Sequence, residues 1–368
     1  MREIKTDLAV LDAMNHDMAG APDAYQPSGP TAEIVKSLNL ELRSQSLNES
    51  MRKGSRLLNT IGAVNYPPKQ QLNYTFGLLR DKNLLTESQI KELNAAYDVI
   101  FSDGDLPILP YELGINSLNE AAYRAAAQFG ELNGARPLSE LSLSHSDDSM
   151  YHFEVEGRSY SYMFLYYYMR YAYCCRFIDF ARIENYVEIG SGSGRQVEII
   201  KRLYPRINFY VVDLPPQLYV CRQLLSSIFE SDVVPYDLTR SEGFARVEGA
   251  GKIATLLPHK LGDLRLQGLT LSWNSMVYCI MPKEVVQNYL NILKGIVDYI
   301  YIIEPMPNTS DSKYGIDDPV QFEDYIEYLK PAFDNVDRSK AFRPLSQMKG
   351  GWGEACDTFW KKQGAGLR

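Results

Sequence analysis

The sequence predicts a doubly wound α/β sheet that follows a mainly helical N-terminal region. Three observations predict this fold. Short apolar segments recur through the second half of the 368-residue chain, amphipathic helical patterns separate them, and a glycine-rich turn joins the first strand pattern to its helix. Strands that alternate with helices of this length pair in parallel through right-handed crossovers, so helices are expected on both faces of the sheet.

The composition excludes several classes of protein. Hydrophobic residues make up 45% and charged residues 23% of the chain, as in ordinary globular proteins, and the formal charge is −8. A broad basic face for nucleic acid or an anionic membrane is therefore not expected. The five cysteines form no CxxC pair, which argues against zinc. Arg170 and Arg176 interrupt the most apolar stretch, residues 160–178, so we expect no membrane span.

The N-terminal region is expected to cover residues 1–150. Residues 1–30 predict a loosely packed arm because they end in several Gly and Pro residues, and a helical pattern begins at Thr31. Residues 72–97 and 117–131 also look helical, with a loop at 101–114 between them. The Ser- and Asp-rich residues 133–150 predict a linker. This region is expected to act as a cap and to be a possible dimerisation surface, in a cytoplasmic protein whose opening residues lack the apolar run of a secretory signal.

The second domain is expected to cover residues 151–368. A tyrosine-rich helix is predicted at 160–178, and its tyrosines suit either a packed core or contacts with sugar rings. The predicted strands are Tyr186–Ile189, Phe209–Val212, Lys252–Leu257, Leu269–Trp273 and Tyr299–Ile303. Helical patterns follow the first, second and fourth of these strands.

The turn after the first strand carries the most informative motif. Gly190, Gly192 and Gly194 are spaced G-x-G-x-G, one residue shorter than the dinucleotide fingerprint G-x-G-x-x-G. Glycines at these positions let the backbone turn sharply and approach a ligand closely. Glu188 lies two residues before the first glycine, where its carboxylate would repel a diphosphate and attract a cation.

The second strand ends at Asp213, which lies 23 residues after Gly190. An acidic residue at about this distance can accept hydrogen bonds from both ribose hydroxyls. Pro215 and Pro216 then open the next helix, where no backbone donor is lost. A nucleoside with a cationic tail fits both carboxylates, which indicates S-adenosylmethionine. A nicotinamide or flavin site is the alternative.

These motifs resemble those of class I S-adenosylmethionine-dependent methyltransferases over roughly residues 155–305. The resemblance is carried by Val187–Arg195 and by Val212-Asp213-Leu214-Pro215. Weaker patterns resemble the sugar O-methyltransferase family: Leu256-Leu257-Pro258-His259, then Asn274-Ser275 and Met281-Pro282. Val277 and Ile280 depart from that family's pattern, in which Ser and Glu are expected.

The resemblance implies roles for individual residues in a Rossmann-like class I methyltransferase sheet. Glu188 and the Gly190 backbone should meet the methionine amino group, and Ser191 and Gly192 should line the floor beneath the ribose. Asp213 should hold the ribose hydroxyls. The adenine and the remaining cofactor contacts should come from Leu214, Pro258, His259 and Asn274.

The expected function is O-methylation of a hydroxyl on a sugar or sugar-containing metabolite, with S-adenosylmethionine as cofactor and no metal. The protein would then mainly align donor and acceptor, and a general base would help. His259, Tyr278 and Glu304 are the candidates. His259 could instead contact adenine, the high ordinary pKa of Tyr278 favours orienting the acceptor, and Glu304 could instead bond backbone amides. The alternatives are a methyltransferase for a phenol or amine, or a non-catalytic cofactor-binding protein.

Overall fold

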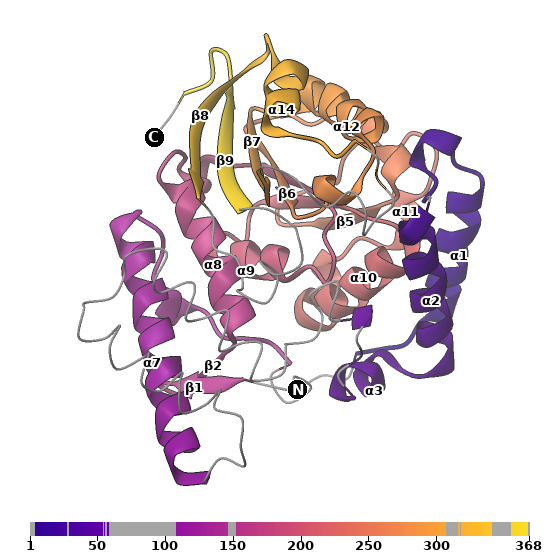
Figure 1. The fold of residues 1–368 in the computed structure, drawn as a ribbon. Helices are drawn as coiled ribbons and strands as arrows, with labels where there is room; N and C mark the ends of the chain where they lie inside the picture. Colours follow the sequence, from indigo (N-terminus) through magenta and orange to yellow (C-terminus); the bar gives the residue numbers. More distant parts are fainter. Residues whose placement is uncertain are drawn as a thin grey trace. The chain divides into compact units, whose positions relative to one another are not determined.

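The computed structural model describes residues 4–27, 29–53, 55, 57–58, 108–145, 152–306, 316, 318–340 and 355–366. The chain divides into two compact units (Figure 1). The first, called here the sheet unit, comprises Met1–Val64, Phe177–Ala341 and Gly351–Arg368. The second, called here the helical unit, comprises Asn65–Arg176 and Phe342–Gly350.

The sheet unit is built on a seven-stranded sheet with the order β5-β4-β3-β6-β7-β9-β8. Its strands are β3 (Asn185–Ile189), β4 (Asn208–Val212), β5 (Ile253–Leu256), β6 (Thr270–Ser275), β7 (Tyr299–Pro305), β8 (Phe333–Lys340) and β9 (Ala355–Lys362). The first five pair in parallel, whereas β9 runs antiparallel to both β7 and β8. The predicted doubly wound sheet is therefore confirmed, and each predicted strand lies within two residues of its observed bounds.

Helices cover both faces of this sheet, as the alternation of patterns predicts. They are α9 (Arg195–Leu203), α10 (Pro215–Phe229), α11 (Tyr236–Thr239), α12 (Lys283–Ile296) and α14 (Phe322–Leu329). The apolar face of α12, with Val286, Leu290 and Leu293, packs into one core with Val187 and Ile302 of the sheet. Figure 1 shows α12 and α14 together on this side. On the other side α10 belongs to a separate core with the N-terminal helices.

The first 30 residues are not a loose arm. They contain α1 (Leu8–Ala19), whose side chains Leu11, Met14 and Met18 are buried against α10. Two further helices, α2 (Gly29–Ser44) and α3 (Leu47–Arg52), follow. The sequence pattern is weak here because polar residues separate the apolar ones. These apolar side chains are buried by α10, which lies about 200 residues later in the chain.

The compact units divide the chain at 64–65 and 176–177, whereas the sequence predicts one boundary at residue 150.

The helical unit contains α7 (Ile108–Leu132), α8 (Tyr162–Cys175) and a hairpin of β1 (Phe153–Val155) and β2 (Arg158–Tyr160). The predicted loop at 101–114 is therefore helical from residue 108 onward. Most α8 tyrosines are buried: Tyr162, Tyr166, Tyr168, Tyr171 and Tyr173. The Tyr168 hydroxyl donates to the Arg136 carbonyl (2.8 Å). These tyrosines therefore form part of a packed core, as one of the two predictions for them states, and are not placed to stack on a sugar. The predicted helical region at 72–97 lies outside the described residues.

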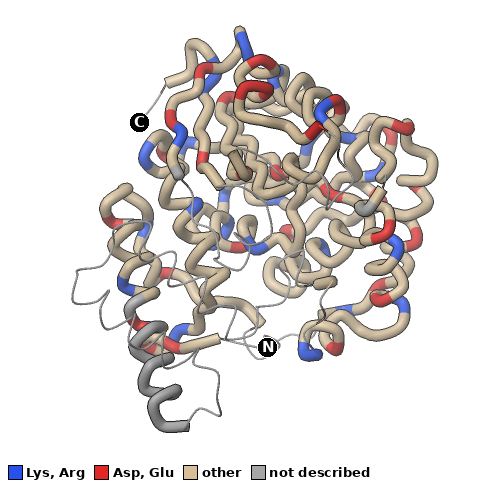
Figure 2. Tube along the Cα trace, in the orientation of Figure 1, with Lys and Arg blue, Asp and Glu red and all other residues tan. Residues whose placement is uncertain are grey.

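Charges of both signs are interspersed along the described trace (Figure 2). All five cysteines are buried, and none of them is in a disulfide. None of the helices within the described ranges combines the length and the apolar character needed to cross a membrane.

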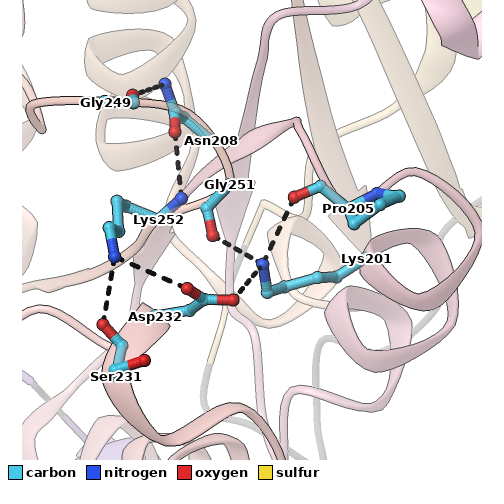
Figure 3. Close-up of polar contacts among 8 residues, drawn as sticks. All are labelled: Lys201, Pro205, Asn208, Ser231, Asp232, Gly249, Gly251 and Lys252. Carbon is cyan, nitrogen blue, oxygen red and sulfur yellow. Dashed lines mark hydrogen bonds and ion pairs between the residues drawn. The ribbon is translucent and has the colours of Figure 1, made fainter.

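A buried lysine, Lys201 of α9, makes several polar contacts near the N-terminal ends of the parallel strands (Figure 3). The Lys201 ammonium donates to the Gly251 carbonyl (2.5 Å) and pairs with Asp232 (3.0 Å), and its side chain is 2% exposed. Asp232 also pairs with Lys252, whose side chain is 33% exposed. The two lysines therefore share one partner but differ in burial.

We expect Lys201→Met to lower the free energy of unfolding by about 2 kcal/mol, because the buried Gly251 carbonyl loses its donor and Asp232 loses an ion-pair partner. Lys252→Met is the matched control, and a half-exposed ion pair contributes less than about 1 kcal/mol. Urea denaturation of both variants measures the difference. Equal losses would show that burial does not strengthen the Lys201 contacts.

Candidate functional site

The glycine-rich turn after β3 has the left-handed backbone geometry that its motif predicts. Gly190, Gly192 and Gly194 have φ angles of +76°, +53° and +76°, a region that side-chain-bearing residues rarely adopt. The Gly190 N–H donates to the Val212 carbonyl at 2.8 Å, and the Gly194 N–H donates to the Ser191 carbonyl at 2.9 Å. These bonds fold the turn tightly between β3 and the start of α9.

Asp213 closes this turn from the neighbouring strand. One carboxylate oxygen accepts a hydrogen bond from the Gly192 N–H (2.9 Å) and the other accepts one from the Leu214 N–H (2.8 Å). Burial raises the pKa of Asp213 to about 6, and these two amides oppose the rise. The residue keeps some solvent-accessible surface. Each carboxylate oxygen has further lone-pair sites, so Asp213 can accept additional hydrogen bonds from a ligand.

Glu188 lies on the adjacent strand and is 3% exposed. In the register of the sheet it pairs with Val211 of β4 on one side and with Trp273 of β6 on the other. The structure therefore places one predicted carboxylate near the end of β3 and the other directly after the end of the neighbouring strand β4. Ser191, beside them in the turn, is 8% exposed.

Asn274 at the end of β6 is buried, with 1% exposure. Its side-chain amide donates to the Ile189 carbonyl at 3.1 Å, which ties the end of β3 to β6. The structure thus gives Asn274 a positioning role beneath the turn, whereas the resemblance implies direct cofactor contact.

Glu304 at the end of β7 holds the segment that follows β6. One of its carboxylate oxygens accepts from the Val277 N–H (2.8 Å) and the Tyr278 N–H (2.9 Å), and the other accepts from the Cys279 N–H (3.2 Å). The side chain is 1% exposed, and burial raises its pKa to about 7. This is the backbone-amide role that the sequence leaves open as an alternative, and in this geometry Glu304 positions the segment after β6.

The segment that Glu304 holds contacts the glycine turn. A Cβ atom placed on Gly190 would come within 2.3 Å of the Val277 side chain. Met276, one residue earlier, has a φ angle of +62°, which is unusual for a residue with a side chain. Such a conformation persists only where neighbouring contacts enforce it. Glu304, Val277 and Gly190 therefore form one connected arrangement around the end of the sheet.

Tyr278 does not face the site. Its side chain is fully buried, its ring lies 6.3–6.4 Å from the rings of Tyr325 and Tyr289, and burial raises the pKa of its phenol well above 10. A phenol in this position cannot orient an acceptor, so the prediction for Tyr278 is corrected. Spacing alone could not reveal this, because the turn after β6 directs Tyr278 into the core beneath α12.

His259 lies immediately after β5, in a 3₁₀ turn that Pro258 opens, and it is partly exposed. Burial lowers the pKa of its imidazole, and the neighbouring Lys260 charge adds to this, so the ring is neutral at pH 7. Its ring lies 6.5 Å from that of Tyr25. The local sequence pattern around Tyr25 gives no signal that predicts this contact with His259.

Two further features of the described residues bear on where the site lies: possible metal ligands and surface grooves. Among the described residues, no three His, Cys, Asp or Glu side chains are grouped so that they could hold a metal ion. A surface groove of about 640 Å³ lies at the opposite edge of the sheet, near Asn185, Asn208 and the loop around Glu242. It contains none of the predicted site residues.

No family model matches the chain, and no curated protein matches it. Solved structures do show similarity. The magnesium protoporphyrin IX methyltransferase of Synechocystis PCC 6803 with bound SAH is 8% identical, covers 78% of this chain and 100% of its own, and has a TM-score of 0.37. The pyocyanin biosynthetic protein PhzM is 14% identical, with 55% of this chain and 57% of its own covered and a TM-score of 0.36. An O-methyltransferase from a trans-AT PKS multienzyme of Brevibacillus brevis, in complex with S-adenosyl-L-homocysteine, is 12% identical, with 50% and 68% covered and a TM-score of 0.36.

Proposed function

We propose that the chain is an S-adenosylmethionine-dependent O-methyltransferase that acts on a hydroxyl of a sugar or sugar-containing metabolite. One observation supports the cofactor: Glu188 in β3 and Asp213, directly after the neighbouring strand β4, flank a turn of three glycines in the left-handed region. A carboxylate pair at the ends of adjacent strands suits a nucleoside that carries an ammonium and a sulfonium. Glu188, two residues before the glycine turn, would repel the diphosphate of a nicotinamide cofactor.

The residues present fit this ligand. Asp213 keeps accessible surface and lone pairs for two ribose hydroxyls, and Gly192 leaves the backbone beside it uncovered by a side chain. Glu188 provides the negative charge for the ammonium at the end of β3. The Gly190 N–H is already bonded to Val212, so its carbonyl oxygen is the backbone group that could meet the ammonium.

The reaction would be an in-line displacement in which a hydroxyl oxygen forms a bond to carbon as the carbon–sulfur bond breaks. The cofactor supplies a methyl group that its positive sulfur already activates. The chain would hold the donor through Glu188 and Asp213 and keep the glycine turn rigid through Glu304 and Asn274. Alignment of this kind can provide ~7–11 kcal/mol of the barrier reduction. The hydroxyl proton would leave to water or to a base on the acceptor side.

Calorimetry with the full chain tests the cofactor. We expect heat of binding with S-adenosylmethionine and with S-adenosylhomocysteine, and none with NAD. Binding of NAD alone, or of neither compound class, would contradict the proposal.

A panel of nucleotide sugars and glycans with methyl-labelled cofactor tests the acceptor. Label is expected on a sugar hydroxyl, with one S-adenosylhomocysteine released per methyl transferred. Label found only on phenols or amines would contradict the sugar assignment while leaving the cofactor assignment intact. Cofactor binding without transfer to any acceptor would favour a non-catalytic binding protein.

A further inference from the structure

The N-terminal segment is firmly anchored on the sheet unit. At one end of α1, the Asp7 N–H donates to the Tyr219 hydroxyl of α10 (3.0 Å). Toward the other end, Asp17 accepts a hydrogen bond from the Tyr236 hydroxyl (3.0 Å) and forms an ion pair with Arg240 (2.5 Å). With its apolar side buried on α10, α1 leads into a short 3₁₀ turn, Asp23–Tyr25, in a fixed position.

That turn places one aromatic ring beside the predicted nucleoside site. The Tyr25 ring lies edge-on to both the His259 ring (6.5 Å) and the Tyr289 ring of α12 (6.3 Å). The Asn288 side chain donates to the Tyr25 hydroxyl at 3.3 Å. The following residue, Gln26, is tied back to the Met18 and Ala21 carbonyls. Tyr25 therefore has a defined orientation, yet it stays partly exposed.

This aromatic group lies next to the carboxylate expected to hold the ribose. The parallel register pairs Val212 of β4 with Leu256 of β5, so Asp213 and the segment that carries His259 leave neighbouring strands at the same end of the sheet. The Asp213 charge also contributes, after burial, to the raised pKa of Tyr289. A base joined to a ribose on Asp213 would thus extend toward Tyr25, Tyr289 and His259.

His259, which lies beside Tyr25, also has a polar atom without a hydrogen-bond partner among the described residues. This atom is Nδ1, and it is buried. A neutral imidazole has one donor and one acceptor nitrogen, so the ring can bond an amino group on a heterocycle. An aromatic wall with one free polar atom is suited to a purine with an exocyclic amine.

We propose that Tyr25, carried by the N-terminal segment, is a binding residue for the adenine of the cofactor and that it forms one wall of the base pocket together with His259. The proposal rests on the proposed function, because it takes S-adenosylmethionine as the ligand. It assigns residues 7–26 to the nucleoside side of the site. The N-terminal segment would therefore complete the cofactor site of the domain to which it is anchored.

Calorimetry of the full chain with S-adenosylhomocysteine tests Tyr25. We expect Tyr25→Ala to raise the dissociation constant about tenfold, since aromatic contacts to a base contribute substantially to nucleic-base affinity. Tyr25→Phe keeps the ring and should stay within about threefold of the unmodified protein. Competition by free adenosine should weaken by the same factor in Tyr25→Ala, because the ring is expected to contact the base and not the amino-acid part.

Tyr204→Ala is the matched control. Tyr204 is also a partly exposed tyrosine with an aromatic partner, Phe180 at 5.5 Å, but it lies between α9 and the beginning of β4, at the opposite edge of the sheet. Its removal should leave the dissociation constant unchanged. If Tyr25→Ala fails to fold, Tyr25→Leu keeps apolar contact without the ring and should still weaken binding severalfold.

Two results would separate the possible failures. Normal or tighter binding of S-adenosylhomocysteine by Tyr25→Ala would overturn the role of Tyr25 and leave the methyltransferase proposal standing. No binding of S-adenosylhomocysteine by the unmodified protein would overturn the proposed function itself.

Discussion

Replacement of Asp213 by alanine is expected to weaken the binding of S-adenosylmethionine at least about 100-fold. Two ribose hydroxyls would lose a charged acceptor, and hydrogen bonds to charged groups contribute ~1.5–3 kcal/mol each. The Gly192 N–H would also lose its partner, which loosens the glycine turn. Calorimetry measures the change. Asp298→Ala is the control, because Asp298 also accepts a backbone N–H, that of Thr270 (2.9 Å), but lies where β7 begins. Unchanged affinity in Asp213→Ala would contradict the ribose assignment.

The same residue predicts a pH dependence of binding. The carboxylate form accepts the ribose hydrogen bonds, and burial raises the pKa of Asp213 to about 6. Affinity should therefore be highest above pH 6 and fall by up to about tenfold per pH unit below it, as the carboxylate becomes protonated. Asp213→Asn cannot be protonated in this range, so it should bind more weakly but show a flatter profile. An equally steep profile in Asp213→Asn would assign the pH dependence to another group.

Replacement of Glu304 by alanine is expected to lower the free energy of unfolding by about 3 kcal/mol, because three backbone N–H groups lose the carboxylate that accepts from them and each loss costs ~1 kcal/mol or more. The Tyr278 N–H keeps a long contact to Asn274 Oδ1 (3.5 Å). Chemical denaturation measures this loss. Glu284→Ala is the control, since Glu284 is exposed on α12 and its removal should change stability by less than about 0.5 kcal/mol. A neutral effect of Glu304→Ala would mean that the loop does not depend on these bonds.

Glu304→Gln separates positioning from proton transfer. Glutamine keeps one carbonyl oxygen for two of the amides, so a positioning role predicts a smaller loss of stability and substantial remaining turnover. A fall in turnover of 100-fold or more with normal stability would instead support the general-base alternative.

The stability of the protein should also change with pH through Glu304. Its pKa in the folded state, about 7, is above its ordinary value of 4.5 because burial disfavours the charge. The folded state thus keeps a proton that the unfolded state releases. This contribution is fully present below about pH 4.5 and is lost as the pH rises to about 7. Glu304→Gln should reduce that slope, which denaturation at several pH values would reveal.

The local pattern of apolar residues was sufficient to predict the parallel strands of the sheet. Each parallel strand is an apolar segment buried on both faces, and the glycine turn with Asp213 fixes the carboxyl edges of β3 and β4. The strands β8 and β9 were not predicted. They pair antiparallel at the end of the sheet, and charged residues such as Asp334, Asp337 and Arg338 interrupt the apolar pattern of β8.

The sequence by itself determined the parallel sheet, the left-handed glycine turn and the carboxylates of Glu188 and Asp213, because these depend on short-range alternation, on the conformational freedom of glycine and on where a strand ends. Only the tertiary structure decided that Glu304 bonds backbone amides, that Tyr278 points into the core and that Tyr25 lies beside His259. These three outcomes depend on which distant surfaces bury one another. Such burial is a property of the packed chain, and the residues next to each side chain in sequence carry little information about it.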